Sequence, residues 1–519
     1  MESPKYYDTA LPPARRPTLQ AHSAPPPAPA SRVMGLRVIA RLLGMLVGVL
    51  GFSMLLCLGW PLYYGEWPTL LALGGATAVT LAGGGALFVW GRGSRRTIYR
   101  REALAVVGLG WLLIGAFGAL PYLLTGTCTG FADAYFEATS GFTTTGATVL
   151  GDLSSVSHGV LFWRMLTHWL GGMGIIVLFT ALFAHLGVGA KQLFRSETPG
   201  PITENLRPTI KESALTMWKI YSSLTAVLVV LLMLCGMGPF DAVCHAFATL
   251  ATGGYSTHDQ SVGYFNSLAV EMVLLVFMFI AGVNFTLYYQ ALRGNWRSLA
   301  RNREFHVYAG TIALVSLVIA VDTYALHGEN LGQSLRHASF QTVSIITTTG
   351  FGTDDFDTYP TLSKMTLVCL MFVGGCAGST AGGMKVSRLM VLCKIAYQEI
   401  YRAFRPQAQM SVRIGRSVVG PEIARSILVF AFMFFVFFAG GSLFMSALGL
   451  DLTAATTSVI ACLGNIGPGL GAVGPTRNYA DLPDAGKLFL SLCMLLGRLE
   501  LTTLLVLLLP SFWKRIMQP

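Results

Sequence analysis

Four short segments rich in glycine and threonine interrupt the apolar sequence, and their residue types suit the binding of a dehydrated cation. Rings of backbone carbonyl oxygens can replace the hydration shell of a monovalent ion where the chain runs extended. Glycine permits the backbone conformation that this requires. The same residues also serve close helix packing, but four recurrences at comparable intervals favour an ion filter. The candidate filter consists of four equivalent triplets: Thr144, Thr145 and Gly146; Thr252, Gly253 and Gly254; Thr348, Thr349 and Gly350; Asn465, Ile466 and Gly467.

A short predicted helix precedes each triplet. In every case a residue that can cap a helix N-terminus is followed by about ten helix-forming residues, a length too short to cross a bilayer. We therefore expect four pore helices that begin at the outer face and stop midway, each with the partial negative charge of its C-terminus directed at the ion. The predicted caps are Asp133, Asp241, Ser334 and Asp451.

The composition requires a membrane around these elements. Of the 519 residues, 53% are hydrophobic and 12% are charged, and the mean hydropathy is +0.59, so the chain has too little polar surface for a soluble globule of this size. About ten apolar stretches approach the roughly 20 residues that a bilayer crossing needs. They are Ala40–Leu58, Leu70–Trp90, Leu104–Leu124, Val160–Phe183, Ile220–Leu234, Leu268–Leu292, Tyr308–Ala325, Met365–Cys393, Ile427–Leu448 and Leu488–Leu509.

A unit of span, half-helix, extended strand and second span occurs four times, after two leading spans. Irregular backbone survives at membrane depth only where it lines a cavity, so the four units should surround a pore. The predicted fold class is an all-α polytopic membrane protein with about ten transmembrane helices, arranged as four pseudo-fourfold pore repeats and two N-terminal helices. The predicted segments are a disordered cytoplasmic tail (1–36), two N-terminal helices (37–99) and pore repeats at 100–190, 191–295, 296–400 and 401–519.

The basic residues predict the orientation of the chain. Most of the 36 lysines and arginines lie in the N-terminal tail, in four alternate loops and at the C-terminus. By the positive-inside rule these segments are cytoplasmic, which places both termini on the cytoplasmic side. Topology and contact with anionic lipid headgroups therefore explain the formal charge of +11, and nucleic-acid binding is not indicated.

A glycine-rich stretch breaks the second span of the third repeat. Close helix packing through small residues is one explanation, but so many glycines destabilise a continuous helix. We expect an intramembrane loop beneath the filter that blocks or admits ions as it moves. Ionisable residues at membrane depth are costly and are therefore functional candidates, which adds one lysine and one arginine. The candidate gate residues are Gly374, Gly375, Gly378, Ser379, Thr380, Gly382, Gly383, Lys385 and Arg498.

Three filter segments resemble those of the Trk/Ktr/HKT superfamily of potassium transporters. They are Thr-Thr-Thr-Gly-Ala around Gly146, Thr-Thr-Thr-Gly-Phe around Gly350 and Gly-Asn-Ile-Gly-Pro-Gly around Gly467. With its two leading spans, the chain is similar from about residue 37 to 515 to the transmembrane subunit of bacterial Trk potassium uptake. The resemblance implies uptake of K⁺ bound at the filter triplets, with Rb⁺ accepted and Na⁺ less so, because sodium-favouring members tend to carry serine at the position of Gly146. The second segment, Ala-Thr-Gly-Gly-Tyr, departs from the pattern in a way that is similar to the family's own asymmetry.

The same resemblance implies a gate and partners. The glycine-rich loop would be the gate, and Arg498, with Lys385, would form an electrostatic barrier beside it. The protein would be a homodimer in the inner membrane of a bacterium, and it would bind a cytoplasmic TrkA-like regulatory ring that carries nucleotide. That ring would dock on basic loops such as Lys191–Lys219 and Arg402–Arg416. The chain itself has no soluble βαβ unit with G-x-G-x-x-G, so we expect it to bind no cofactor.

Two other functions are compatible with parts of the sequence. An H⁺- or Na⁺-coupled potassium symporter could bind its ions at broken helices, although parallel repeats favour a pore. An intramembrane enzyme would need a serine and a histidine within hydrogen-bond reach, but Ser140 lies in a segment that recurs without it, so we expect no enzyme.

No periodic series of acidic residues connects the histidines near the spans, so we expect core or interface roles for them. These are His168, His185, His245 and His337.

Overall fold

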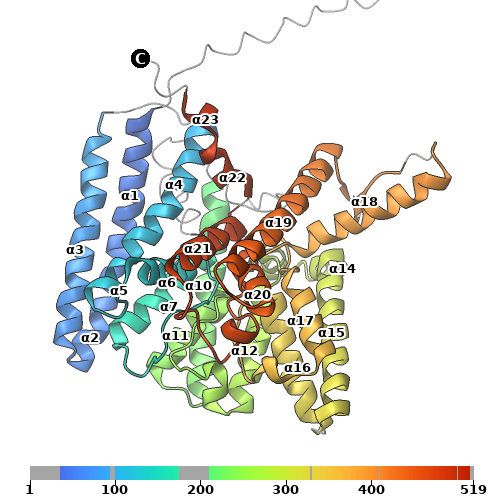
Figure 1. Cartoon of the computed structure of the whole chain (residues 1–519), viewed down its shortest axis with the longest axis horizontal. Helices are drawn as coiled ribbons and strands as arrows, with labels where there is room; N and C mark the ends of the chain where they lie inside the picture. The colour runs from blue at the N-terminus through green and yellow to red at the C-terminus, as the bar shows by residue number, and fades with distance from the viewer. Residues whose placement is uncertain are drawn as a thin grey trace, which may run out of the picture.

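The computed structural model describes residues 35–93, 100–174, 210–327, 330–407, 410–415, 417–499 and 501–514, which are mostly helical (Figure 1). Within these residues the strands are limited to one antiparallel hairpin, β1 (Arg413–Ile414) and β2 (Ser417–Val418). Six helices of the described part are long and apolar enough to cross a membrane. The predicted all-α polytopic fold is confirmed, whereas nearly all of the predicted tail, 1–36, lies outside the described residues.

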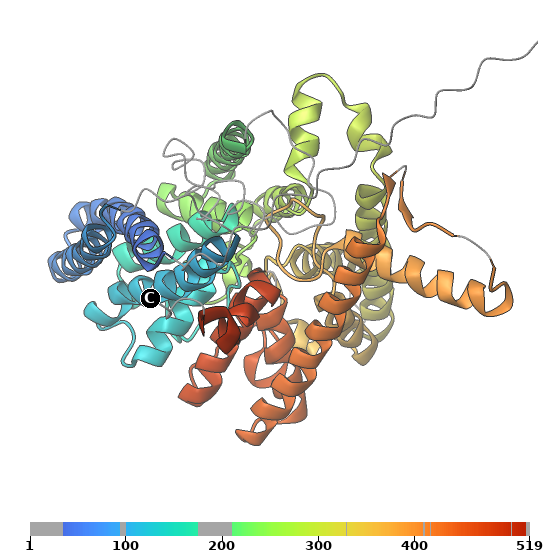
Figure 2. The same cartoon turned by 90° about the horizontal axis from the view of Figure 1, so that it is seen from above.

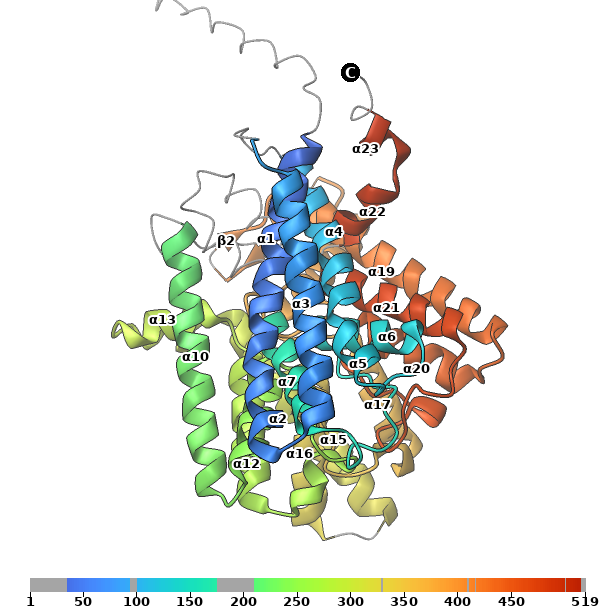
Figure 3. The same ribbon diagram turned by 90° about the vertical axis from the view of Figure 1, so that its left-hand side faces the viewer.

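Two N-terminal helices stand side by side (Figure 3), at the left edge of the molecule in Figure 1. Helix α1 (Leu36–Leu55) continues through a 3₁₀ turn, η1 (Leu56–Leu58), into α2 (Gly59–Tyr64), and the chain then returns as α3 (Trp67–Trp90). Glycine lets the two backbones approach closely at Gly44, since a Cβ atom there would collide with backbone atoms of Gly84 and Phe88. This pair packs against the first pore repeat, with α1 against α4 (Arg100–Gly118) and α3 against α5 (Leu120–Leu124) and α7 (His158–Gly172).

Each pore repeat begins with a long helix that packs against the shorter helix that follows it. The shorter helices have 12 or 16 residues, about 18 to 24 Å at the α-helical rise, which is less than the thickness of the hydrocarbon core. They match the predicted pore helices. The pairs are α4 (Arg100–Gly118) with α6 (Phe131–Phe142), α10 (Ile210–Leu234) with α11 (Pro239–Leu250), α15 (Arg303–His327) with α16 (Leu331–Ile346), and α19 (Pro421–Ala447) with α20 (Leu452–Leu463).

The second spans of the second, third and fourth repeats are broken. Helices α12 (Leu268–Ala281) and α13 (Phe285–Leu292) meet at 96°, so the continuous span predicted over Leu268–Leu292 is wrong. The Asn284 side chain caps the N-terminus of α13 by accepting a hydrogen bond from the Thr286 amide at 2.8 Å. In the third repeat the glycine-rich loop separates α17 (Thr361–Met371) from α18 (Val386–Phe404), and in the fourth α21 (Asp484–Arg498) ends before α22 (Leu501–Leu505).

The first repeat has its second span in α7 (His158–Gly172), and part of the predicted span Val160–Phe183 lies outside the described residues. Short connecting elements complete the described fold. They are α5 (Leu120–Leu124), η3 (Ser261–Phe265), α14 (Arg297–Arg301), η4 (Phe356–Thr358), η5 (Gly471–Val473), η6 (Val506–Leu508) and α23 (Pro510–Lys514).

Pore helices and second spans alternate around a closed ring. The order is α6, α7, α11, α12, α16, α17, α20 and α21, and α21 packs in turn against α6. Each neighbouring pair in this order is in contact, and the view from above shows the repeats distributed around a common centre (Figure 2). Chain segments from all four repeats therefore meet at one place, as the repeated sequence pattern predicts.

The predicted helix caps are correct at one of four positions. The Asp451 carboxylate accepts hydrogen bonds from the Thr453 and Ala454 amides and caps α20. The other three pore helices begin three or four residues earlier than predicted, because a glycine or asparagine upstream supplies the extended backbone of the cap. The observed cap residues are Gly130, Gly238 and Asn330 in place of Asp133, Asp241 and Ser334.

Candidate functional site

All four pore helices end in the same left-handed turn. The first residue of each candidate triplet has left-handed backbone geometry, with φ of 54° at Thr144, 55° at Thr252, 56° at Thr348 and 55° at Asn465. In the first repeat the Thr144 amide donates to Gly141 O (3.1 Å) and the Thr145 amide donates to Ser140 O (2.9 Å); the other three helices end with the equivalent pair. A β-branched residue rarely adopts this conformation, which costs about 1–3 kcal/mol at each position. Strain therefore recurs at one structural position in three of the four repeats.

The four register glycines lie side by side in a ring. Each has a positive φ, between 78° and 102°, and the direction in which a Cβ atom would project is occupied by a carbonyl oxygen of the next repeat. The contacts run in cyclic order and return to the first repeat. They are Gly146 to Gly253 O, Gly254 to Thr349 O, Gly350 to Ile466 O, and Gly467 to Thr145 O. The carbonyl oxygens of the four middle residues thus surround one axis, and any side chain at a register position would displace one of them.

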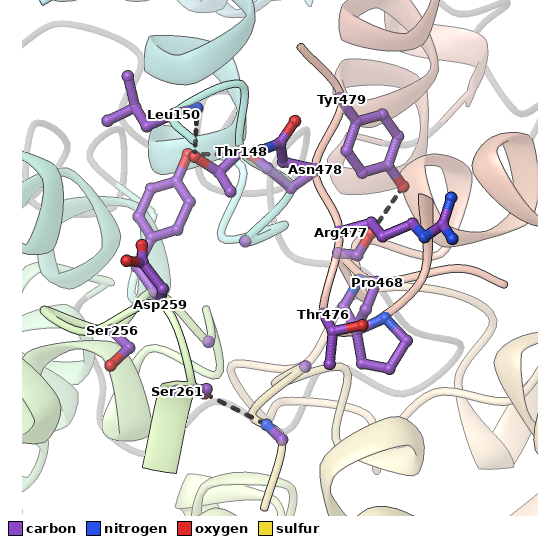
Figure 4. A pocket seen from close by; sticks show the side chains of 18 of the residues that line it. Thr148, Leu150, Ser256, Asp259, Ser261, Pro468, Thr476, Arg477, Asn478 and Tyr479 are labelled. Atoms are coloured by element: carbon purple, nitrogen blue, oxygen red, sulfur yellow. Dashed lines mark hydrogen bonds between the residues drawn. The ribbon is translucent and has the colours of Figure 1, made fainter. Parts of the chain in front are cut away.

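A cavity of about 120 Å³ lies next to this ring, on the side of the residues that follow each triplet. All four register glycines line it, together with loop residues from each repeat, several of which Figure 4 shows around the opening. Hydrogen bonds join the loops of successive repeats around this cavity and close a second ring. They are Leu153 N to Asp259 Oδ1 (3.0 Å), Gly352 N to Ser261 Oγ (3.3 Å), Gly471 N to Asp357 Oδ2 (3.1 Å) and Tyr479 N to Thr148 O (2.8 Å).

A buried ion pair that the sequence analysis missed supports the strands of the first two repeats. Arg164 Nε lies 2.6 Å from Glu137 Oε1, and both side chains are buried. Glu137 also accepts a hydrogen bond from the Val149 amide (3.0 Å), while Arg164 donates to Ser256 O (2.9 Å) and lies 3.5 Å from the centre of the Tyr255 ring. The pair therefore connects the chain just beyond both triplets. Its only sequence signal is an acid in a predicted pore helix and a base in a predicted span.

The glycine-rich loop lies against the other side of the ring. Its Gly382 amide donates to Thr348 Oγ1 at 2.7 Å, and a Cβ atom on Gly382 would contact the Asn465 side chain. Lower in the loop, Cys376 N donates to Gly282 O (2.9 Å) and Gly378 O accepts from Phe285 N (3.1 Å). The loop therefore fills the space between the first residues of the triplets and the break between α12 and α13.

The two candidate cations of the gate both contact the loop. Arg498 donates from Nη1 to Thr380 O (2.8 Å) and from Nη2 to Gly171 O (2.6 Å) and Gly172 O (2.9 Å). Its guanidinium group therefore connects the loop to the C-terminal end of α7. The ammonium group of Lys385 is buried and donates to Ala381 O, within the same loop. The structure brings together every residue of the candidate filter and the candidate gate.

A second carboxylate that sequence reasoning missed connects the middle of the loop to the first turn of α18. Glu304 Oε1 accepts a hydrogen bond from the Ala377 amide at 2.7 Å and another from the Ser387 amide at 3.0 Å. The Glu304 side chain is buried at the start of α15. Nothing in the sequence relates this residue to a loop more than seventy positions later, because an acid at the end of a span is an ordinary feature.

The sequence and the fold are similar to those of known cation transport proteins. The model of the TrkH family, described as cation transport protein, matches residues 76–315 and 304–515. The Trk system potassium uptake protein TrkH of Salmonella typhimurium is 39% identical over 498 residues, covering 93% of this chain and 100% of the relative, and TrkH of Escherichia coli K12 is 39% identical with the same coverage. The crystal structure of the potassium transporter TrkH from Vibrio parahaemolyticus superposes with a TM-score of 0.83 and 35% identity, over 93% of this chain and 100% of that one.

Proposed function

The chain belongs to the TrkH family of cation transport proteins, and from this premise we propose that it takes up K⁺ through a central pore whose filter is the ring of four triplets. It is a multi-pass membrane protein, and its relatives are transporters and not enzymes, which sets aside the intramembrane enzyme. The proposal extends to the location of the protein in the inner membrane of a bacterium, with both termini cytoplasmic.

The cyclic contacts of the register glycines carry this proposal. Four carbonyl oxygens from four different repeats, those of Thr145, Gly253, Thr349 and Ile466, face one axis between a polar cavity and the loop. Such a ring offers a dehydrated cation several oxygen ligands without a fixed negative charge, which suits a monovalent ion that must also leave. The four pore helices direct the negative ends of their dipoles toward the same place. K⁺ would be the favoured ion, Rb⁺ would follow it, and Na⁺ would be transported less.

The loop and its two cations form the proposed gate. Since Gly382 contacts Thr348 at the base of the filter, an ion that leaves the filter must pass the loop. Arg498 holds the loop to α7 through three carbonyl oxygens and places a positive charge in the ion path, and Lys385 adds a second. Loop displacement would remove both the steric and the electrostatic obstacle.

The proposed regulation needs other chains. We place a second copy of this protein and a cytoplasmic TrkA-like nucleotide-binding ring beside it, because its relatives are named as members of a Trk system and the described residues contain no βαβ unit that could bind a nucleotide. The candidate docking segment Arg402–Arg416 begins at the end of α18, which projects from the helical body (Figure 1). Most of the other candidate segment, Lys191–Lys219, lies outside the described residues.

Uptake of ⁸⁶Rb⁺ by liposomes that contain the purified chain tests the proposal. With K⁺ inside only and equal pH and Na⁺ on both sides, a passive pore accumulates ⁸⁶Rb⁺, and external K⁺ suppresses this uptake much more than Na⁺ does. Uptake that requires an imposed H⁺ or Na⁺ gradient would instead identify a symporter. Equal suppression by K⁺ and Na⁺ would contradict the proposed filter.

A further inference from the structure

The filter ring lacks one side chain at the position before the register glycine. The first and third repeats have Thr145 and Thr349 there, and each hydroxyl lies 2.7 Å from the hydroxyl of the threonine two residues earlier. The second repeat has Gly253, which has no side chain to contact its surroundings. Glycine is also the residue with the greatest backbone freedom, so this strand needs support from another part of the protein.

The imidazole ring of His168 occupies the place of the missing side chain. A Cβ atom on Gly253 would lie 2.5 Å from Cγ and Nδ1 of His168 and 2.7 Å from its Cδ2, so ring and side chain cannot coexist at this position. His168 belongs to α7, in the first repeat, and its side chain is buried. A residue of the first repeat thus completes the packing of the filter strand of the second.

The ring is fixed in place from two further directions. His168 Nδ1 lies 2.9 Å from Gly141 O, and because a carbonyl oxygen only accepts, Nδ1 must carry the hydrogen. The centre of the imidazole ring is 4.1 Å from that of Tyr255, which follows the second triplet. His168 therefore connects the end of pore helix α6 to Gly253 and to Tyr255, which lie on either side of the Gly253 carbonyl group. The oxygen of this carbonyl group is the one that faces Gly146.

We propose that His168 is a positioning residue of the ion filter, which fills the space of the side chain absent at Gly253 and holds the Gly253 carbonyl oxygen in the ring. This inference rests on the proposed function, because it assigns His168 to the selectivity of that same filter. A purely structural histidine would support helix packing at this point without any specific effect on the choice between K⁺ and Na⁺.

A side-chain exchange between the two positions tests the proposal. The variants are His168→Ala, Gly253→Thr and the double variant His168→Ala/Gly253→Thr, which gives the second repeat the threonine of the first and third. The readout is the ratio of the K⁺ and Na⁺ concentrations that halve ⁸⁶Rb⁺ uptake, measured in liposomes with equal amounts of protein. Leu166→Ala is the matched control, since Leu166 is buried on the same helix but, two residues away, faces another direction.

We expect His168→Ala to lower the preference for K⁺ by about tenfold, equivalent to ~1.4 kcal/mol of differential ion binding. The double variant should recover most of the preference, whereas Gly253→Thr alone should lose uptake and Leu166→Ala should match the parent. If His168→Ala does not yield folded protein, His168→Gln, which retains a donor for Gly141 O, should give an intermediate preference. Parent-like preference in His168→Ala or in its Gln substitute, no recovery in the double variant, or an equal loss in Leu166→Ala would overturn the proposal. Failure of the parent to discriminate between K⁺ and Na⁺ would instead refute the proposed function.

Discussion

The amide of Gly382 donates a hydrogen bond to the Thr348 hydroxyl at 2.7 Å, so the glycine-rich loop is attached to the base of the filter. Thr348 is one of the residues in the left-handed conformation, and its backbone geometry determines the direction of the strand that follows. A movement of the loop therefore breaks a contact with a residue that shapes the ion ring. The proposed gate and the proposed filter therefore share this contact.

Replacement of a register glycine should reduce selectivity. In Gly350→Ser the new Cβ atom collides with Ile466 O and lies 2.9 Å from Pro468, and φ is +83°, so a ring oxygen must move. We expect the preference for K⁺ over Na⁺ in ⁸⁶Rb⁺ uptake to fall by about tenfold or more. Gly352→Ser is the control, because there the nearest atom lies 3.7 Å away in ordinary contact. Parent-like preference in Gly350→Ser would remove this glycine from the filter.

Removal of the Arg498 guanidinium group should loosen the proposed gate. Arg498→Ala deletes the hydrogen bonds to Thr380 O and to the end of α7, together with one positive charge from the ion path. The initial rate of ⁸⁶Rb⁺ uptake in liposomes should rise several times. Arg402→Ala serves as control, since that arginine is exposed and its ion pair with Glu399 lies on the projecting α18. A rate at or below that of the parent, with normal protein yield, would count against a gate at Arg498.

We expect Glu304 to hold the loop as a hydrogen-bond acceptor, and not through its negative charge. Glu304→Ala leaves the Ala377 and Ser387 amides without their partner, so we expect faster uptake and easier proteolysis of the loop. Glu304→Gln retains an acceptor oxygen of the same reach and should stay close to the parent in both measurements. If uptake by Glu304→Gln were as fast as that by Glu304→Ala, and both were faster than that of the parent, the negative charge, and not the pair of hydrogen bonds, would hold the loop.

Loss of one partner from the buried ion pair should destabilise the protein. Arg164→Leu leaves Glu137 charged and buried without its cation, which costs about 3–5 kcal/mol. The double variant Glu137→Leu/Arg164→Leu should lose less than the sum of the two single variants, as thermal unfolding in detergent would show. Additive losses would mean that the two side chains do not stabilise each other.

The elements that break the apolar pattern were predictable from the sequence. The triplets stand out because glycine and threonine recur at comparable intervals, and the loop stands out because several glycines gather within one span. Glu304 and the pair of Glu137 with Arg164 act through partners far away in the chain, and no local pattern marks them. The bend after α12 was missed because apolar residues continue on both sides of the short break before Asn284, so hydropathy alone shows one span.

Anomalous diffraction from crystals grown with Rb⁺ in place of K⁺ would locate the ion binding site without any assumption about the transport mechanism. We expect a peak on the axis of the ring formed by the carbonyl oxygens of Thr145, Gly253, Thr349 and Ile466. Absence of a peak there, in crystals of a preparation that transports ⁸⁶Rb⁺ in liposomes, would contradict the assignment of this ring as the ion filter.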